Sequence, residues 1–295
     1  MIYIKRVECP KVLDLSKGDS AASKEYVKVI EYFETKDRDY KFEAYSKGNV
    51  KKVLLEMFNN KCAYCESKVD PVSYGDIEHF RPKGAYHAKD GDALEYPGYY
   101  WLAMDWNNLL FACDVCNRSF KKNKFPLVNE ALRKKAHDHI LIEEPLLIDP
   151  CNENDSPQDY ICFTEDGLIQ YKDGEGNKGQ TTIEVCGLFR ANLTEARKVI
   201  AKDIEDKKTQ ALGYLKTIST LTSLPNPELY EDVIQSNFND LESVYEALKK
   251  LNLPTSPYLA MVRDLTAEFL LNQGAQIEYL VTNYKQIMSR QSVGV

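Results

Sequence analysis

Four cysteines arranged as two Cys-x-x-Cys pairs constrain the fold of this chain more than any other feature of its sequence. The pairs are Cys62 with Cys65 and Cys113 with Cys116. The chain has 8 cysteines among 295 residues, so chance predicts only about 0.2 such pairs. Two thiolates from each tight turn complete the tetrahedral coordination of one zinc ion. We therefore predict a structural zinc (Zn2+) held by these four side chains.

The 47 residues between the two pairs exceed the interval usual in a zinc ribbon, so a separate structural unit has to lie inside the clamp. An alternating run over Asp76–Phe80 predicts a short strand, and Val115–Lys124 is compatible with a short helix. Before the first pair, apolar residues recur at helical intervals over Lys24–Thr35 and Asn49–Asn60, with Asn49 as the cap of the second helix.

The chain after the clamp changes character. A hairpin is predicted over Tyr160–Tyr171. Asn192 and Glu195 resemble a capping box that opens a helix to about Ser219, and three further helical patterns follow. We predict an α+β chain in four parts: an N-terminal arm and helix (1–48), a zinc-clamped core (49–140), a covering β-hairpin element (141–191) and a helical C-terminal region (192–295).

The composition is that of a globular protein, with 43% hydrophobic and 28% charged residues. No run approaches the roughly 18 apolar residues of a membrane span, and the first residues lack a secretory signal, so a cytoplasmic protein is expected. The net charge of -7 argues against wholesale nucleic-acid binding. Asn117–His137, however, carries seven basic residues against Glu130 alone, a local charge of +6.

Three blocks inside the clamp stand out together. They are Asp76–Gly84 with the sequence DIEHFRPKG, Trp106–Leu110 with WNNLL, and Cys113–Lys121 with CDVCNRSFK. Over about residues 62–124 they resemble the HNH endonuclease superfamily. The resemblance implies a zinc-clamped ββα-metal HNH nuclease core in an H-N-N variant, with a small β-hairpin element and a mostly α-helical C-terminal region beside it.

By this resemblance His79 is the general base and Asn108 orients its ring, while Glu78 and Asn117 are ligands of a catalytic divalent ion. Glu78 stands where Asp is commoner, and Asn117 where many members have His. An imidazole with an ordinary pKa of about 6.5 suits the deprotonation of water, and Mg2+ or Mn2+ suits the phosphate. Lys121, four residues past Asn117, is expected on the same helix face and in contact with a substrate phosphate.

A wider resemblance extends from residue 2 to about residue 200. The runs YYWLAMDWNNL at Tyr99–Leu109 and EPLLIDP at Glu144–Pro150, with an FxxDG hairpin after them, look like the PtuB-type HNH nucleases of Septu and retron-associated antiphage systems. This implies cleavage of DNA or RNA in bacterial defence, together with a separately encoded ABC/SMC-like ATPase, PtuA. For retron-associated members it implies a reverse transcriptase and its msDNA as further partners. No membrane partner is expected, because the chain lacks an apolar run of spanning length.

Other functions fit the sequence less well. Gly174–Thr181 superficially resembles a phosphate-binding loop, but Gln180 replaces the required lysine, which predicts a flexible loop. A zinc deaminase needs His-x-Glu and a proline before its second cysteine pair, where this chain has Ala112. The remaining alternative is a non-catalytic zinc-knuckle adaptor that binds nucleic acid or protein through the basic segment. Such an adaptor has no need of Glu-His and Asn at HNH spacing, which favours the nuclease.

Overall fold

The computed structural model describes residues 1–70, 73–89, 91–137, 142–172 and 177–292, with side chains to residue 284. The chain forms two compact units. Unit 1 consists of Met1–Cys162 and Ile169–Leu193, and unit 2 consists of Phe163–Leu168 and Thr194–Val295. In the described ranges, helices accompany two small two-stranded sheets, β1-β2 and β3-β4, so the predicted α+β class is confirmed.

A two-stranded antiparallel sheet lies at the centre of unit 1. β1 (Asp76–His79) pairs with β2 (Leu109–Ala112), and His79 lies opposite Leu109. All four residues of β2 are fully buried, which explains why this strand reads as a continuous apolar run. α2 (Val50–Met57) packs against the sheet with Val50 and Leu54 fully buried. The apolar spacing thus correctly predicted both α2 and β1.

The segment after the second cysteine pair is a π-helix and not the α-helix that the spacing suggested. η5 runs over Val115–Lys121, and the backbone N–H of Lys122 donates to the carbonyl oxygen of Asn117 at 2.7 Å, an i to i+5 bond. Residues four apart still lie close to one face of a π-helix, because its turn holds roughly four to five residues. What packs against that face therefore decides the surroundings of Lys121, and its side chain is fully buried.

α1 (Ala21–Phe33) opens unit 1 and begins at Ser20, whose hydroxyl accepts a hydrogen bond from the backbone N–H of Ser23 at 3.0 Å. Asn49 precedes α2, but its side chain makes no capping hydrogen bond, so the cap expected there is only positional. The remaining short helices are η1 (Lys11–Leu13), η2 (Ala44–Ser46), η3 (Tyr100–Leu102), η4 (Trp106–Asn108), η6 (Glu130–Leu132) and η8 (Pro227–Tyr230).

The predicted hairpin is present as β3 (Ile161–Phe163) and β4 (Ile169–Tyr171), preceded by α3 (Pro157–Tyr160). The flexible loop expected over residues 174–181 is wrong for its second half, because α4 (Lys178–Val185) begins there. Residues 174–176 lie outside the described residues. Gly179 permits this helix to approach α3, since a Cβ at that position would lie 2.2 Å from the carbonyl oxygen of Tyr160.

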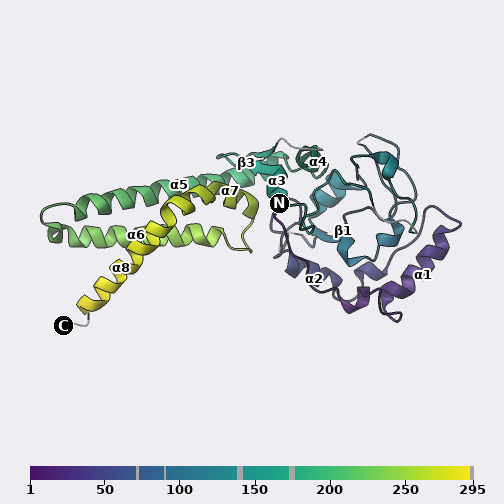
Figure 1. Ribbon diagram of the computed structural model, residues 1–295, viewed down its shortest axis with the longest axis horizontal. Helices are drawn as coiled ribbons and strands as arrows, with labels where there is room; N and C mark the ends of the chain where they lie inside the picture. Colours follow the sequence, from purple (N-terminus) through teal and green to yellow (C-terminus); the bar gives the residue numbers. More distant parts are fainter. Residues whose placement is uncertain (71–72, 90, 138–141, 173–176, 293–295) are drawn as a thin grey trace. The chain divides into compact units, whose positions relative to one another are not determined.

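Unit 2 is a helical assembly of α5 (Ala191–Thr222), α6 (Glu231–Leu251), α7 (Leu259–Phe269), the π-helix η9 (Leu270–Gly274) and α8 (Ala275–Ser292). α5 and α6 lie side by side, and their apolar residues share one core with α7 and α8 (Figure 1). Asn192 is not a cap, because the helix has already begun: the N–H of Leu193 donates to the carbonyl oxygen of Arg190 at 3.1 Å. Among the described residues, no helix combines the length and the apolar character that a membrane span requires.

Candidate functional site

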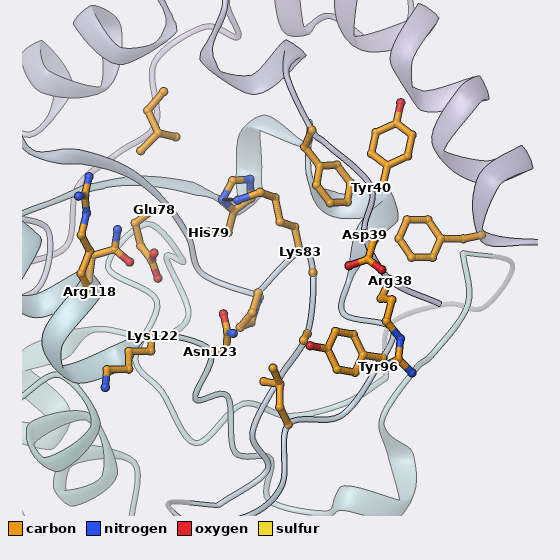
Figure 2. A pocket seen from close by; sticks show the side chains of 18 residues that line it. Arg38, Asp39, Tyr40, Glu78, His79, Lys83, Tyr96, Arg118, Lys122 and Asn123 are labelled. Carbon is orange, nitrogen blue, oxygen red and sulfur yellow. Dashed lines mark hydrogen bonds between the residues drawn. The ribbon is translucent and has the colours of Figure 1, made fainter. Parts of the chain in front are cut away.

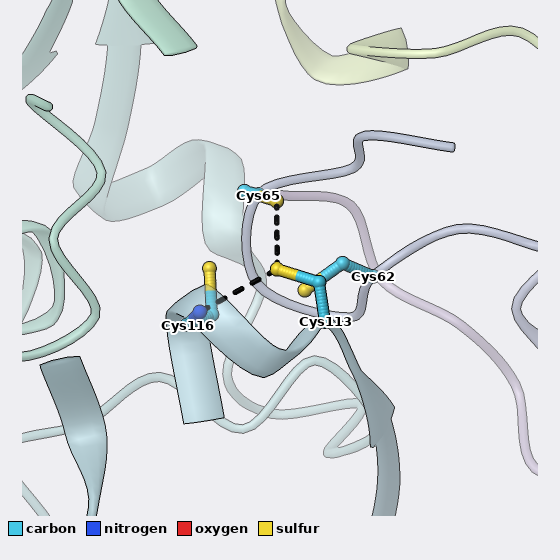
Figure 3. A group of neighbouring side chains, drawn as sticks. All are labelled: Cys62, Cys65, Cys113 and Cys116. Atoms are coloured by element: carbon cyan, nitrogen blue, oxygen red, sulfur yellow. Dashed lines mark hydrogen bonds between the residues drawn. The ribbon is translucent and has the colours of Figure 1, made fainter. Parts of the chain in front are cut away.

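The four paired cysteines converge in unit 1, and their sulfur atoms all lie within 4.8 Å of one another. Figure 3 shows the sulfur of Cys113 facing that of Cys65, at 3.9 Å. A tetrahedral zinc with Zn–S bonds of about 2.3 Å separates its sulfurs by about 3.8 Å, so the spacing fits this ion. The predicted four-cysteine cluster is therefore confirmed as a group compatible with zinc.

The chain beyond α4 also supports this cluster, which no pattern in the sequence indicated. Arg190 donates from Nη1 to the sulfur of Cys116 at 3.4 Å. Gly187 adopts a φ of +61° and lies against Phe120, where an added Cβ would be 2.2 Å from the ring. Arg190 and Gly187 thus join this part of the chain to η5 and to the four-cysteine cluster.

His79 closes β1 and is only 5% exposed. Its Nε2 lies 3.0 Å from the carbonyl oxygen of Ala103, so Nε2–H is the donor. This tautomer leaves Nδ1 as an acceptor, 3.3 Å from the ammonium nitrogen of Lys83. Burial, and then the charge of Lys83, hold the pKa of His79 well below its usual range. The ring is therefore neutral at physiological pH, and the lone pair of Nδ1 faces the ammonium of Lys83.

Asn108 does not touch the His79 ring, contrary to the role expected of it. Its Nδ2 donates to the carbonyl oxygens of Arg81 and Leu102 at 3.0 and 3.1 Å, and its Oδ1 accepts from the N–H of Arg81 at 2.8 Å. The amide therefore ties the backbone of Arg81, just after β1, to the backbone of Leu102, which immediately precedes Ala103. Its effect on the ring is indirect, because Ala103 supplies the carbonyl that holds Nε2.

Lys121 is fully buried, so the predicted contact with a substrate phosphate is wrong. Its ammonium pairs with Oε1 of Glu78 at 2.5 Å and donates to the carbonyl oxygen of His79 at 3.1 Å. The physical reason is the buried carboxylate of Glu78 on β1, which holds the ammonium against the sheet and away from solvent. Lys121 thus neutralises part of the charge of Glu78 and holds the end of β1.

Two side-chain oxygens near His79 have no hydrogen-bond partner among the described residues. All the hydrogen bonds and ion pairs of the Glu78 carboxylate go to Oε1, from Lys121 and from the hydroxyl of Tyr64 at 3.4 Å, which leaves Oε2 open. Asn117 donates from Nδ2 to Asp76 at 3.1 Å, which leaves its Oδ1 open. One carboxylate oxygen and one amide oxygen are the donor set that Mg2+ or Mn2+ takes beside phosphate and water.

These groups share a pocket of about 540 Å³, which both Glu78 and Asn117 line. Figure 2 shows His79 and Lys83 in the middle of this pocket, with Arg118 and Lys122 on one side of them. The described lining contains four basic side chains, Arg38, Lys83, Arg118 and Lys122, and two acidic ones, Asp39 and Glu78. The pocket is therefore suited to a ligand that carries negative charge.

Lys83 is the residue of this pocket that sequence reasoning missed as a site residue, although it stands in the block that carries His79. The loop that presents Lys83 is held by Gly98, whose N–H donates to the carbonyl oxygen of Gly84 at 2.9 Å. A Cβ on Gly98 would lie 2.6 Å from backbone atoms of Pro82 and Ala85. Burial lowers the pKa of Lys83, and Glu78 counteracts this effect.

Septu protein PtuB of Bacillus mycoides (strain KBAB4) is 43% identical over 283 residues, which cover 96% of this chain and 95% of that protein. Septu protein PtuB of Bacillus thuringiensis is 34% identical over 145 residues, 49% of this chain and 42% of that protein. Septu protein PtuA of Bacillus mycoides (strain KBAB4) is 30% identical over 207 residues, 69% of this chain but 26% of that protein.

No family model matches the chain. No solved structure matches it either. The similarity to the Bacillus mycoides PtuB runs through both units, and it leaves only 5% of that protein unmatched. This extent and this level of identity establish the relationship: the chain belongs to the PtuB family of Septu proteins.

Proposed function

We propose that this chain is an HNH endonuclease that hydrolyses phosphodiester bonds with a divalent metal ion. One observation carries the proposal: the neutral Nδ1 of His79 and two open oxygens, on Glu78 and Asn117, belong to one basic pocket. The order of strand β1, strand β2 and helix η5, with the cysteine cluster at their ends, supports a ββα-metal core.

His79 is the general base in this proposal. Nδ1 takes a proton from water, and the water oxygen forms a bond to phosphorus as the bond from phosphorus to the leaving oxygen breaks. The carbonyl of Ala103 stays on Nε2–H throughout and stabilises the imidazolium that results. Glu78 and Asn117 would hold Mg2+ or Mn2+, which supplies charge for the phosphate oxygens and the leaving oxygen. Lys83 adds a second positive charge beside Nδ1.

The test of this proposal is cleavage by the purified full chain. We expect nicking or cutting of at least one of three substrates, plasmid DNA, single-stranded DNA or tRNA, in the presence of Mg2+ or Mn2+. EDTA should stop the reaction, and added Mg2+ or Mn2+ should restore it, because in this proposal the two open oxygens serve only to bind the ion. Absence of cleavage of all three, with the chain alone and with a PtuA-type protein added, would contradict the proposal.

We further propose that the chain acts in antiphage defence together with an ABC/SMC-like ATPase of the PtuA type. The match to a Septu PtuA supports this, because 26% of that protein resembles this chain and the rest lies outside the match. That PtuA therefore combines a part that resembles this chain with a longer part that does not. Such a combination in one protein is expected where the two parts act together. The net charge of -7 also implies weak independent affinity for nucleic acid, which a partner would remedy.

Co-expression with the separately encoded PtuA-type protein is expected to give one stable complex on size-exclusion chromatography. ATP should change the cleavage rate of that complex through the PtuA-type ATPase. It should not change the rate of the chain alone, because the chain itself offers no phosphate-binding loop. Separate elution at micromolar concentration, with cleavage that is unaffected by nucleotide, would contradict the partnership. That outcome would leave the nuclease proposal standing, since the two are measured independently.

A further inference from the structure

One wall of the His79 pocket is aromatic. Phe33, Tyr40, Phe42 and Tyr96 line the pocket, and each is partly exposed. They come from the end of α1, from the segment that follows it and from the segment before Gly98. In Figure 2, Tyr40 and Tyr96 lie on the side of His79 and Lys83 opposite to Arg118 and Lys122.

Phe33, Tyr40 and Phe42 are held in place by one another, whereas Tyr96 packs against the guanidinium of Arg38. Phe33 stacks on the buried Tyr100 with ring centroids 4.2 Å apart and planes at 10°. Phe42 lies 6.4 Å from Phe33 at 16°, and Tyr40 lies 5.0 Å from Phe42. Mutual packing of this kind fixes the orientation of the rings before a ligand arrives. Binding to their exposed faces therefore costs little side-chain conformational entropy.

Positive charge accompanies the rings. The guanidinium of Arg38 lies 4.6 Å from the centroid of Tyr96, and the ammonium of Lys83 lines the same pocket. Aromatic rings interleaved with cations in one groove form the arrangement that binds single strands of nucleic acid, with bases on rings and phosphates on Lys or Arg. A pocket made only to hold a phosphate would have no use for four partly exposed rings.

We infer that this aromatic wall stacks an unpaired base next to the cleaved phosphate, so that the substrate is single-stranded or locally unwound. The inference rests on the proposed nuclease function and adds the class of substrate to it. A base within a duplex has both faces covered by its neighbours and presents only its edges. A ring of the wall can reach a π-face only after the base has left the stack, and such a base is already free in a single strand.

The test measures binding of fluorescently labelled oligonucleotides by the full chain with His79→Ala, which prevents cutting. Tyr40→Leu and Tyr96→Leu keep apolar volume but remove the π-face, whereas Tyr40→Phe and Tyr96→Phe keep the ring. We expect each leucine variant to weaken binding of single-stranded DNA or RNA at least about fivefold, because one stacked base contributes roughly 1–3 kcal/mol. The phenylalanine variants should bind as the parent does. Tyr74→Leu is the matched control, since Tyr74 is 93% exposed and does not line the pocket.

A second arm uses strands in which individual bases are replaced by abasic residues. The parent should bind more weakly when the abasic residue replaces the stacked base. The leucine variants should show no further loss of affinity with that strand, because the ring that stacks on the base is already absent. Equal binding of duplex and single strand by the parent would overturn the inference, as would leucine variants that bind like the parent. The inference would also be overturned if the leucine variants bound the strand normally but no longer bound the PtuA-type protein. The aromatic wall would then be a protein interface. Cleavage by the His79-containing chain is scored separately, so failure of the nuclease proposal has its own readout.

Discussion

Replacement of His79 with alanine is expected to reduce strand cleavage at least about 100-fold, since a general base typically contributes 10²–10⁴-fold. The variant should still fold. The ring is buried and bonded to Ala103, so its loss should cost about 1–3 kcal/mol of unfolding free energy, less than the stability of most domains. Initial rates on a labelled strand at saturating Mg2+ measure the effect. Zinc content and circular dichroism show whether the fold has survived.

His87→Ala is the matched control for this experiment. His87 is also a histidine of unit 1, but its Nδ1 lies 2.9 Å from the carbonyl oxygen of Asp92 and its side chain does not line the pocket. Cleavage by His87→Ala should equal that of the unmodified chain. Undiminished cleavage by His79→Ala would remove His79 from the mechanism. Binding of nucleic acid by a chain that never cuts it would favour the non-catalytic adaptor.

Replacement of Cys62 with serine is expected to abolish soluble folded protein and not only activity. The purified chain should contain about one zinc per molecule, and binding of a structural zinc contributes about 10–16 kcal/mol in small zinc domains. That contribution is comparable to the whole stability of a domain, about 5–15 kcal/mol. Cys62 is buried, and the backbone N–H of the next residue, Ala63, donates to the carbonyl oxygen of Phe111 at 2.8 Å, so the ligand turn is tied to β2.

Elemental analysis and the yield of soluble protein measure this effect. Cys9→Ser is the control, because Cys9 is a free, partly exposed cysteine outside the four-cysteine cluster. It should leave both zinc content and yield unchanged. Protein purified without chelator that contains no zinc, or a Cys62→Ser variant that folds with full zinc content, would refute the structural role of the cluster.

The sequence predicted those parts of the molecule whose signal is local. Two Cys-x-x-Cys pairs need only a short turn each, so the spacing alone identified the four cysteines that cluster. Apolar periodicity located α2 and β1 to within a few residues. The α+β class followed from the succession of these patterns.

The sequence could not predict features that depend on packing between distant segments. The burial of Lys121 depends on its ion pair with Glu78, a residue far from it in the sequence, and no local pattern records that contact. Tyr40 and Tyr96 belong to different segments, and only the folded chain brings them to one pocket. Asn108 was correctly singled out, but its partners are backbone atoms, whose positions no residue pattern records.

The short excursion of the chain into unit 2 at Phe163–Leu168 limits how this protein can be divided. The N–H of Phe163 donates to Asp264 at 3.2 Å, and the guanidinium of Arg197 lies 5.3 Å from the Phe163 ring. A fragment that ends at Leu193 would keep these six residues without the helices they contact, and a fragment that starts at the next residue would lack them. Neither unit is encoded by one uninterrupted stretch of the gene. Recombination between genes therefore transfers both units intact only when it moves them together.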